Sequence, residues 1–507
     1  MTSTAISTTS NSGSSTSSQP MRLNFDVLFL VMAAMRRRSD ILTCMLTCRT
    51  MHEIGQQYLL RMPLHLPIND SIEPLCEYIL RQFPERSRYL RELTLGTKGD
   101  GRRTYVGVSV INLLAKVLSE AQDLRTMTIH NINQLFLLEN GLSDALSGLK
   151  GITELNLLWP SFPVFQAIEK MESPVKRLNV DFYAYNRQLV NPLPRIANFR
   201  SNLEEVSLSF VKFPPTFDLE KDSVFPKVLK LYIKHSPLTP LDPLVRSFPN
   251  VRSLTIFMFH HPDILSDKET NQRRESNRTT QLRQSWSDLH HFEGDLLSLY
   301  ILGLRDMIVH DVSIMNVTTP VLQFIPILVD IRPSRLSLSI TTRECKMATF
   351  SQYFGRALRE LQLTHLFVTL DLSYSYPDVE DILRDFCAAI KNLSACSVRL
   401  NVEWKPPTQI GISTMRPALG IHTEIYLKLF KPIHLVQRIL WNAPCVTDVC
   451  LEVWLHPITF WRAEPPARKA RIRRFMADTS SDEEWAERAV ERVTDGSSWE
   501  IFFGHEC

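Results

Sequence analysis

A short apolar pattern, apolar-x-x-apolar-x-apolar, recurs along most of this chain. Its regular copies begin at residues 90, 124, 152, 175, 203, 228 and 251, so successive starts differ by 34, 28, 23, 28, 25 and 23 residues. Further copies lie at Leu296/Leu299/Ile301, Leu358/Leu361/Leu363, Leu393/Cys396/Val398 and Val446/Val449/Leu451. The last two apolar positions alternate as they do in a strand, which places both side chains in the same core. A period of this size predicts stacked units that each supply one strand and one returning helix or turn.

The pattern and its period resemble the leucine-rich repeat in an irregular form. Helices are expected between the strands, for example over residues 106–121 and 142–149. The Asn that usually follows the strand in this family is absent from nearly every copy, so we expect no ladder of buried amides. Residues 63–461 are therefore assigned to an irregular leucine-rich-repeat-like solenoid, an α/β fold. The alternative is an unrelated α/β domain, because buried strands of many folds match so loose a pattern.

In a solenoid of this kind, the strand residues that alternate with the core positions line the concave face. Here they are polar, mixed in charge and poor in aromatic side chains. The predicted partner-binding face consists of Glu92, Thr94, Thr126, Thr128, Glu154, Asn156, Arg177, Asn179, Glu205, Ser207, Lys230 and Tyr232, and it continues to Ser253 and Thr255. This composition identifies no particular ligand.

Ahead of the repeats, the stretch from Leu23 to Leu60 predicts three short helices. Asn24 is placed to cap the first, in which nine consecutive residues from position 27 are apolar, too few to span a bilayer. The basic run at 36–38 ends that helix, and Ser39 or Asp40 is expected to cap the second. About forty residues cannot bury so much apolar surface alone. Part of this surface is therefore expected to be a docking face.

The same stretch resembles an F-box, the helical module that ties a substrate receptor to the Skp-type adaptor of a cullin–RING ubiquitin ligase. The residues that carry the resemblance are Leu23, Asp26, Val27, Leu28 and Val31, then Asp40, Ile41 and Leu42, then Cys48 and Arg49. Asn24 replaces the usual Pro and Met51 replaces the usual Trp, and the likeness is closest to the divergent F-boxes of fungal proteins. The resemblance implies an adaptor interface formed by Leu23, Leu28, Val31, Leu42, Leu46, Cys48 and Met51. An ordinary helical hairpin packed on its own domain is the alternative.

The remaining segments divide the chain further. Residues 1–20 are almost entirely Ser, Thr, Gly, Asn and Gln, and are expected to be a disordered tail. The helical module is assigned to residues 21–62, and a helix is expected at 72–83. The polar segment between about residues 260 and 295 is interpreted as an exposed loop with a short helix near its end. Residues 462–507 are assigned to a C-terminal tail with a basic run at 467–475 and an acidic-capped helix at 479–493.

The sequence offers little support for bond chemistry. It contains no nucleophile elbow, phosphate-binding P-loop, HExxH motif or dinucleotide fingerprint. Cys44 with Cys48, and the His pairs at 260–261 and 290–291, lack partners at ligand spacing, so we expect no metal site. Weak candidates remain in the Gly-rich segment 96–103, which could hold an anion, and in the basic run, which could import the protein into the nucleus or contact nucleic acid. For the basic run, pairing with the acidic residues that follow is the favoured interpretation.

Composition agrees with a non-catalytic protein of the cytoplasm or nucleus. A net charge of +3 over 507 residues favours neither nucleic acid nor membrane as a partner. Nine scattered cysteines without a secretory signal indicate reduced thiols. The expected function is that of a substrate-recognition adaptor of a Skp–cullin–F-box ubiquitin ligase, without cofactor, with an unknown protein substrate on the solenoid. The chief alternative is a repeat scaffold for protein–protein interaction whose helical start only caps the solenoid.

Overall fold

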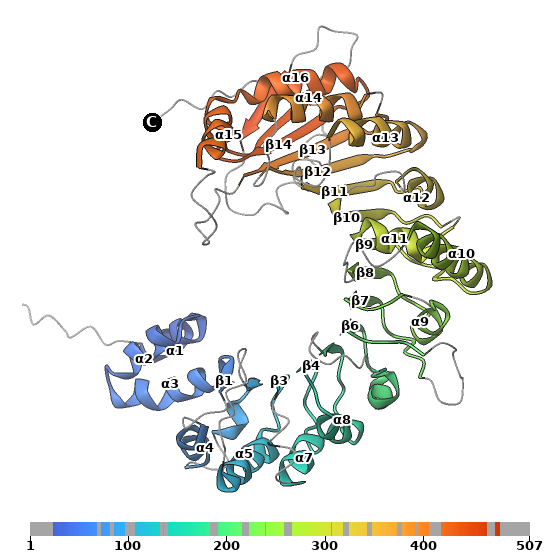
Figure 1. The fold of residues 1–507 in the computed structure, drawn as a ribbon. Coiled ribbons are helices and arrows are strands. Elements are labelled where there is room, and N and C mark those ends of the chain that lie inside the picture. The colour runs from blue at the N-terminus through green and yellow to red at the C-terminus, as the bar shows by residue number, and fades with distance from the viewer. Residues whose placement is uncertain are drawn as a thin grey trace, which may run out of the picture.

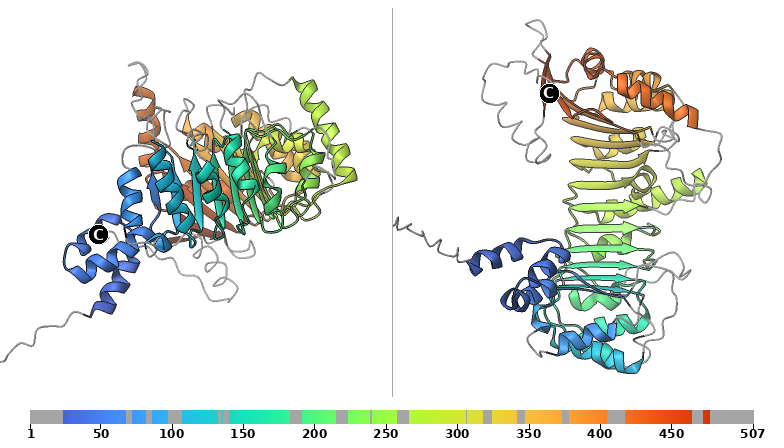
Figure 2. Two further views of the ribbon diagram at one scale, coloured as in Figure 1. Left: turned by 90° about the horizontal axis from the view of Figure 1, so that it is seen from below. Right: turned by 90° about the vertical axis from the view of Figure 1, so that its left-hand side faces the viewer.

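The computed structural model describes residues 24–67, 72–81, 86–96, 107–131, 135, 140–182, 191–214, 223–238, 240–257, 266–305, 307–317, 324–341, 347–372, 378–391, 393–404, 417–463 and 472–476. These residues build one long sheet that curves into an arc (Figure 1). The strands lie on the inner side of the arc, and helices cover its outer side. Seen into the opening, the strands are stacked like rungs (Figure 2, right). This is the architecture of a leucine-rich-repeat-like solenoid.

The described part of the chain forms a sixteen-stranded sheet in which the strands follow one another in sequence order. Its strands are β1 (Leu64–Leu66), β2 (Glu92–Leu95), β3 (Thr126–His130), β4 (Glu154–Leu158), β5 (Arg177–Asp181), β6 (Glu205–Ser209), β7 (Lys230–Lys234), β8 (Ser253–Phe257), β9 (His291–Asp295), β10 (Asp311–Val317), β11 (Arg335–Thr341), β12 (His365–Asp371), β13 (Ser397–Glu403), β14 (Asp448–Val453), β15 (Thr459–Ala463) and β16 (Ile472–Met476). Neighbouring strands pair in parallel from β1 to β14, and the last two pairings are antiparallel. Parallel neighbours need a crossover between them, which the outer helices provide.

The helices are α1 (Phe25–Ala34), α2 (Arg38–Met45), α3 (Arg49–Arg61), α4 (Ile72–Leu80), α5 (Val108–Glu120), α7 (Asn140–Ser147), α8 (Phe162–Glu169), α9 (Asp242–Ser247), α10 (Asp267–Arg283), α11 (Leu296–Leu302), α12 (Phe324–Ile331), α13 (Met347–Glu360), α14 (Val379–Ala389), α15 (Pro417–Leu429) and α16 (Pro432–Asn442). The described residues also form two 3₁₀ helices: η1 (Ser87–Tyr89), which follows α4 ahead of β2, and η2 (Leu193–Phe199), which connects β5 to β6. The predicted helices at 72–83, 106–121 and 142–149 correspond to α4, α5 and α7.

One continuous core runs between the sheet and the outer helices, from Leu60 to Trp461. Its strand residues are those of the repeated pattern; in β4, for example, Leu155 and Leu157 are buried while Glu154 and Asn156 lie on the other face. The regular copies up to residue 251 therefore mark β2 to β8 correctly. The first apolar residue of each copy lies just before the strand.

Several strands are followed directly by a residue whose backbone lies in the left-handed region. The residues after β2, β3, β4, β6 and β7 have φ angles of 98°, 40°, 59°, 56° and 53°. They are Gly96, Asn131, Trp159, Phe210 and His235. The amides of the last four donate to the last carbonyl of the following strand, as from Phe210 to Lys234, whereas the Gly96 amide donates to the Leu66 carbonyl at the end of β1. A left-handed residue turns the chain off the sheet, at a steric cost for a bulky side chain.

Beyond β8, three predictions of the repeat pattern are wrong. Leu296, Leu299 and Ile301 lie in helix α11, because the strand of that unit is β9, just before them. The copy at Leu358 falls in α13, and the true position of the pattern is Leu363/Leu366/Val368 around β12. The copy at Leu393 is displaced in the same way, with Ala395/Val398/Leu400 as the buried set around β13.

The segment at 260–295 was expected to be a loop, but most of its described part is a 17-residue helix, α10. Its capping box is complete: Ser266 Oγ accepts from the Glu269 amide and the Glu269 carboxylate accepts from the Ser266 amide. The buried side chains of α10 are polar, namely Thr270, Arg274, Asn277 and Gln281. Because no apolar stripe marks the buried face, hydrophobic periodicity gave no helical signal.

The boundary predicted after residue 461 is also corrected. Strand β15 crosses it, and β16 continues the sheet within the predicted basic run. The predicted helix at 479–493 and the tail at 1–20 lie outside the described residues, as does the Gly-rich segment from residue 97.

Candidate functional site

The three N-terminal helices form a small unit with its own apolar core. That core consists of Met32 from α1, Ile41 and Met45 from α2, and Met51 from α3. Gly55 permits the close packing, because a Cβ at this position would lie 2.1 Å from Met45 Cγ. Asn24 caps α1 as predicted, with Oδ1 accepting from the Asp26 amide at 2.9 Å. The predicted cap of α2 is wrong, since the helix begins at Arg38 and no side chain caps it.

The faces of α1 and α2 that point away from this core are exposed to solvent. Leu30 is 71% exposed, Leu42 49% and Leu46 87%, and Val27 and Val31 are about as exposed as Leu42. On α2 the division is sharp, because Ile41 and Met45 point inward while the residues directly after them point to solvent. One apolar side of these helices is buried in the unit's core, and the other remains exposed, as is typical of a docking surface.

The apolar core of the solenoid includes no buried residue of α1 or α2. Its continuous core begins at Leu60, near the end of α3, and the core of the three-helix unit is separate from it. The unit is attached through α3, where Gln56 Oε1 accepts from Arg86 Nη2 at 2.7 Å, and through Pro63, whose carbonyl accepts from Arg38. In Figure 1, α1 and α2 accordingly project beside β1 at one tip of the arc.

The predicted adaptor-binding residues differ in their exposure. Val31, Leu42, Leu46 and Cys48 are exposed, and Leu28 is half-buried against the unit's core. Met51 is corrected: it is 3% exposed and fills the core instead of the surface. Leu23 lies outside the described residues.

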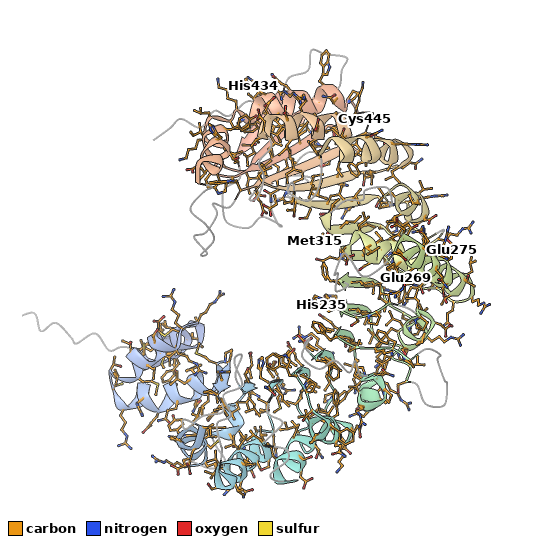
Figure 3. The ribbon with its side chains drawn as sticks, viewed as in Figure 1. His235, Glu269, Glu275, Met315, His434 and Cys445 are labelled. Carbon is orange, nitrogen blue, oxygen red and sulfur yellow. The ribbon has the colours of Figure 1, made fainter. Side chains whose placement is uncertain are left out.

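The predicted concave-face residues form two continuous rows across β2 to β7. Strand register aligns Glu92, Thr126, Glu154, Arg177, Glu205 and Lys230 in the first row, and Thr94, Thr128, Asn156, Asn179, Ser207 and Tyr232 in the second. Neighbouring residues in a row are separated by the distance between strands, about 4.8 Å. All of them are at least partly exposed on the inner face of the sheet. By register the first row continues to Ser253, His291 and Asp311, and the second to Thr255, Glu293 and Ser313. Figure 3 shows His235, which follows β7, and Met315 of β10 on the inner side of the arc.

Charges in and beside the first row are largely paired with one another. Arg177 lies 2.6 Å from Glu154, and Lys176 lies 3.0 Å from Glu204. An open cleft of about 360 Å³ lies here, lined by Thr153, Lys176, Arg177, Glu204, Glu205, Leu229 and Lys230. Burial and the nearby Glu205 carboxylate raise the pKa of Tyr232. This part of the face is charged but nearly neutral overall.

The second row contributes to a different cleft of about 640 Å³, nearer the N-terminal end. It is lined by His65, Thr94, Thr128, His130, Asn156, Leu158 and Asn179. All but Leu158 are polar, and none carries a carboxylate, ammonium or guanidinium group. Asn156 Nδ2 donates to Thr128 Oγ1 at 3.3 Å. This surface, which we call the neutral cleft, offers hydrogen-bonding groups, and His65 and His130 are the ionisable side chains of its lining.

The described residues offer no recognisable catalytic chemistry. Burial raises the pKa of the Cys76 and Cys387 thiols to about 12, so both remain protonated at neutral pH. Within the same residues, no three His, Cys, Asp or Glu side chains gather closely enough to hold a metal ion. None of the helices there has both the length and the apolar character needed to cross a bilayer. That the chain performs no catalysis remains an expectation.

Neither a scan against models of known protein families nor a search of curated proteins finds a match. Among solved structures, the chain is similar to the leucine-rich repeat-containing protein LegL7 from Legionella pneumophila, at 12% identity and a TM-score of 0.36. The alignment covers 75% of this chain and 98% of that one. The fold assignment given above rests on the strand order and the repeated core of this chain itself.

Proposed function

We propose that this chain is the substrate-recognition subunit of a Skp–cullin–F-box type ubiquitin ligase. The exposed apolar side of α1 and α2 would bind the Skp-type adaptor, and the concave face would bind a protein to be ubiquitinated. The chain would form no bonds itself. Its contribution would be to hold substrate lysines at high effective concentration near an enzyme bound elsewhere in the assembly.

One observation carries this proposal: the apolar residues of α1 and α2 are exposed although the solenoid core is complete without them. A helical cap would bury these side chains against the first repeat. Exposed leucines on a small unit that has its own core are instead what a docking module requires. The two departures from the F-box pattern have structural substitutes, since Asn24 caps α1 and Met51 fills the module's core.

The test is a calorimetric titration of the full chain with a Skp-type adaptor. The informative variant is Leu46→Asp, because this side chain is 87% exposed and contributes little to folding. Burying a carboxylate in an apolar interface should weaken binding at least about tenfold, or about 1.4 kcal/mol. Leu28→Asp should abolish binding as well, but Leu28 partly packs on the module's core, so its effect includes folding.

The matched control is Leu282→Asp on α10, a leucine 70% exposed on the outer side of the arc. It should bind like the unmodified chain. If the Leu46→Asp chain binds the adaptor as tightly as the unmodified chain does, the exposed side of α1 and α2 is not the docking face. If the unmodified chain does not bind the adaptor, the chain is instead a repeat scaffold for protein–protein interaction.

A further inference from the structure

Three consecutive arginines border the exposed apolar side of α1 and α2. Arg36 and Arg37 lie between the two helices, Arg38 is the first residue of α2, and all three are exposed. Leu42 and Leu46 follow Arg38 by one and two helical turns, so these three side chains lie on one face of α2. The proposed docking face therefore has a positively charged edge.

The described part of the chain gives these arginines no counter-charge. No described carboxylate lies within ion-pair distance of any of the three, and the Arg38 side chain donates to the Pro63 carbonyl instead. By contrast, Arg49 of α3 pairs with Glu53 at 2.9 Å. Residues 24–62 contain five arginines, no lysine and three acidic residues, so this unit has a net charge of +2, against +3 for all 507 residues. The net positive charge of the chain is thus concentrated in the unit that carries the docking face.

Arginine is also an unfavourable residue where a helix begins. The N-terminus of a helix carries a partial positive charge, which acidic and hydroxyl side chains stabilise. Arg37 occupies the N-cap of α2, Arg38 follows it, and no side chain caps the helix. Asp40 in the first turn offsets only part of this positive charge. A local rule that is broken without a gain in the folded chain is typical of a functional surface.

The other end of the docking face carries the opposite charge. Asp26 lies exposed in the first turn of α1, which has ten residues, so the arginines are about 15 Å away along the helix axis. This exceeds the Debye length of about 8 Å at physiological ionic strength, so the two ends act as separate charges. A uniformly anionic membrane would face Asp26 as well as the arginines. A protein surface can place acidic side chains opposite the arginines alone.

We infer that the docking partner presents an apolar groove with a cluster of acidic side chains opposite the three arginines. The apolar contacts hold the complex together, while the charges speed its formation and fix the direction in which α1 lies on the partner. This inference rests on the proposed function and deepens it, because it states the charge of the surface by which the adaptor binds.

The experiment measures association and dissociation rates of the full chain with a Skp-type adaptor by stopped flow, at about 0.01 M and about 1 M salt. The Debye length is about 30 Å at the lower concentration and about 3 Å at the higher one. The association rate of the unmodified chain should fall at least about tenfold between the two. At low salt, Arg36→Gln/Arg37→Gln should associate at least about threefold more slowly than the unmodified chain, and at high salt the two rates should converge.

Two controls separate the local charge from the net charge and from apolar contact. Arg200→Gln/Arg283→Gln removes the same charge at exposed positions outside the three-helix unit, and it should associate at close to the unmodified rate. Leu46→Ala removes apolar area without a change of charge. It should raise the dissociation rate and leave the salt dependence of association unchanged.

The outcomes distinguish this inference from the proposed function. Equal low-salt association rates for the unmodified chain and Arg36→Gln/Arg37→Gln would overturn the acidic partner and leave adaptor binding intact. No adaptor binding at either salt concentration would contradict both. Vesicles of phosphatidylcholine and phosphatidylserine test the other anionic occupant. If the unmodified chain sediments with them and the Arg36→Gln/Arg37→Gln chain does not, the arginines face a membrane and the inference is wrong.

Discussion

Gly303 shows how one residue fixes the position of a whole helix. It ends α11 in the left-handed region, with φ of 62°, and it lies directly against α10. A Cβ here would approach Arg278 Cγ to 2.7 Å and the Arg274 carbonyl oxygen to 2.8 Å. Both the backbone angle and the space therefore require glycine.

We predict that Gly303→Ala lowers the free energy of unfolding by about 2 kcal/mol, because strain in the left-handed region adds to a clash with backbone. Urea unfolding followed by circular dichroism measures the change. Gly141→Ala is the control: it lies on α7 with its nearest atom 3.9 Å from an added Cβ. It should be neutral or stabilising, as alanine normally is in a helix. Equal midpoints for both variants would show that Gly303 is not constrained.

At the scale of elements, α10 is held on the solenoid by polar contacts. Arg274 is 5% exposed; it pairs with Asp330 of α12 at 2.5 Å and donates to the Tyr300 carbonyl at 3.0 Å. Its guanidinium also lies 4.1 Å from the Tyr300 ring centroid. Burial lowers the pKa of Arg274, and the carboxylate of Asp330 partly offsets this. One arginine thus links α10 to both α11 and α12.

Asp330→Ala should destabilise the chain by about 3 kcal/mol, because it leaves Arg274 buried without its counter-charge. Hydrogen exchange should show α10 losing protection first. Glu53→Ala removes an ion pair whose side chains are 92% and 61% exposed, and should cost less than about 0.5 kcal/mol. If Asp330→Ala lowers the free energy of unfolding no more than Glu53→Ala does, the buried Arg274–Asp330 pair contributes nothing to holding α10 on the solenoid.

A second polar contact joins three helices near the C-terminal end. The Glu380 carboxylate of α14 accepts from the Tyr426 hydroxyl of α15 and from Arg438 of α16. Burial alone would raise the pKa of Glu380, but these two hydrogen bonds outweigh it and lower the pKa. The ionised carboxylate is therefore favoured in the folded chain.

A lowered folded-state pKa predicts stability that is present above the unfolded value, about 4.3 for Glu, and lost as pH falls through the folded value. Glu380→Gln should therefore have a lower melting temperature than the unmodified chain at pH 7. The difference should shrink as the pH is lowered from 4.3. A difference that stays constant between pH 7 and pH 3 would contradict the role of the ionised carboxylate.

Hydrophobic patterns in the sequence located most of the elements whose buried side chains are apolar. The strands β2 to β8 follow from alternating residues such as Leu155 and Leu157, whereas the exposure of Leu42 and Leu46 on α2 was expected from the F-box resemblance. Helix α10 was missed because its buried face is polar, although Ser266 and Glu269 form a visible capping box. Four residues of the neutral cleft, Thr94, Thr128, Asn156 and Asn179, were predicted on the concave face. His65 and His130 were not, because their place beside this row depends on strand register.

At the scale of the whole molecule, the arc separates two surfaces. The three-helix unit lies at one tip, and the sheet faces the interior of the arc (Figures 1 and 2). The two polar rows lie on this inner face of the sheet. Parallel strands in sequence order produce this arrangement, because each unit contacts only its neighbours. A partner on α1 and α2 and a partner on the concave face can therefore bind to different parts of the chain.

Hydrogen–deuterium exchange of the full chain, with and without a saturating Skp-type adaptor, tests the central proposal most directly. We predict added protection in α1 and α2, residues 25–45, and unchanged exchange in strands β2 to β14. That result would place the adaptor on the exposed apolar side of the helical module. Protection on the concave strands, or no change anywhere, would contradict the assignment of this module as the docking site.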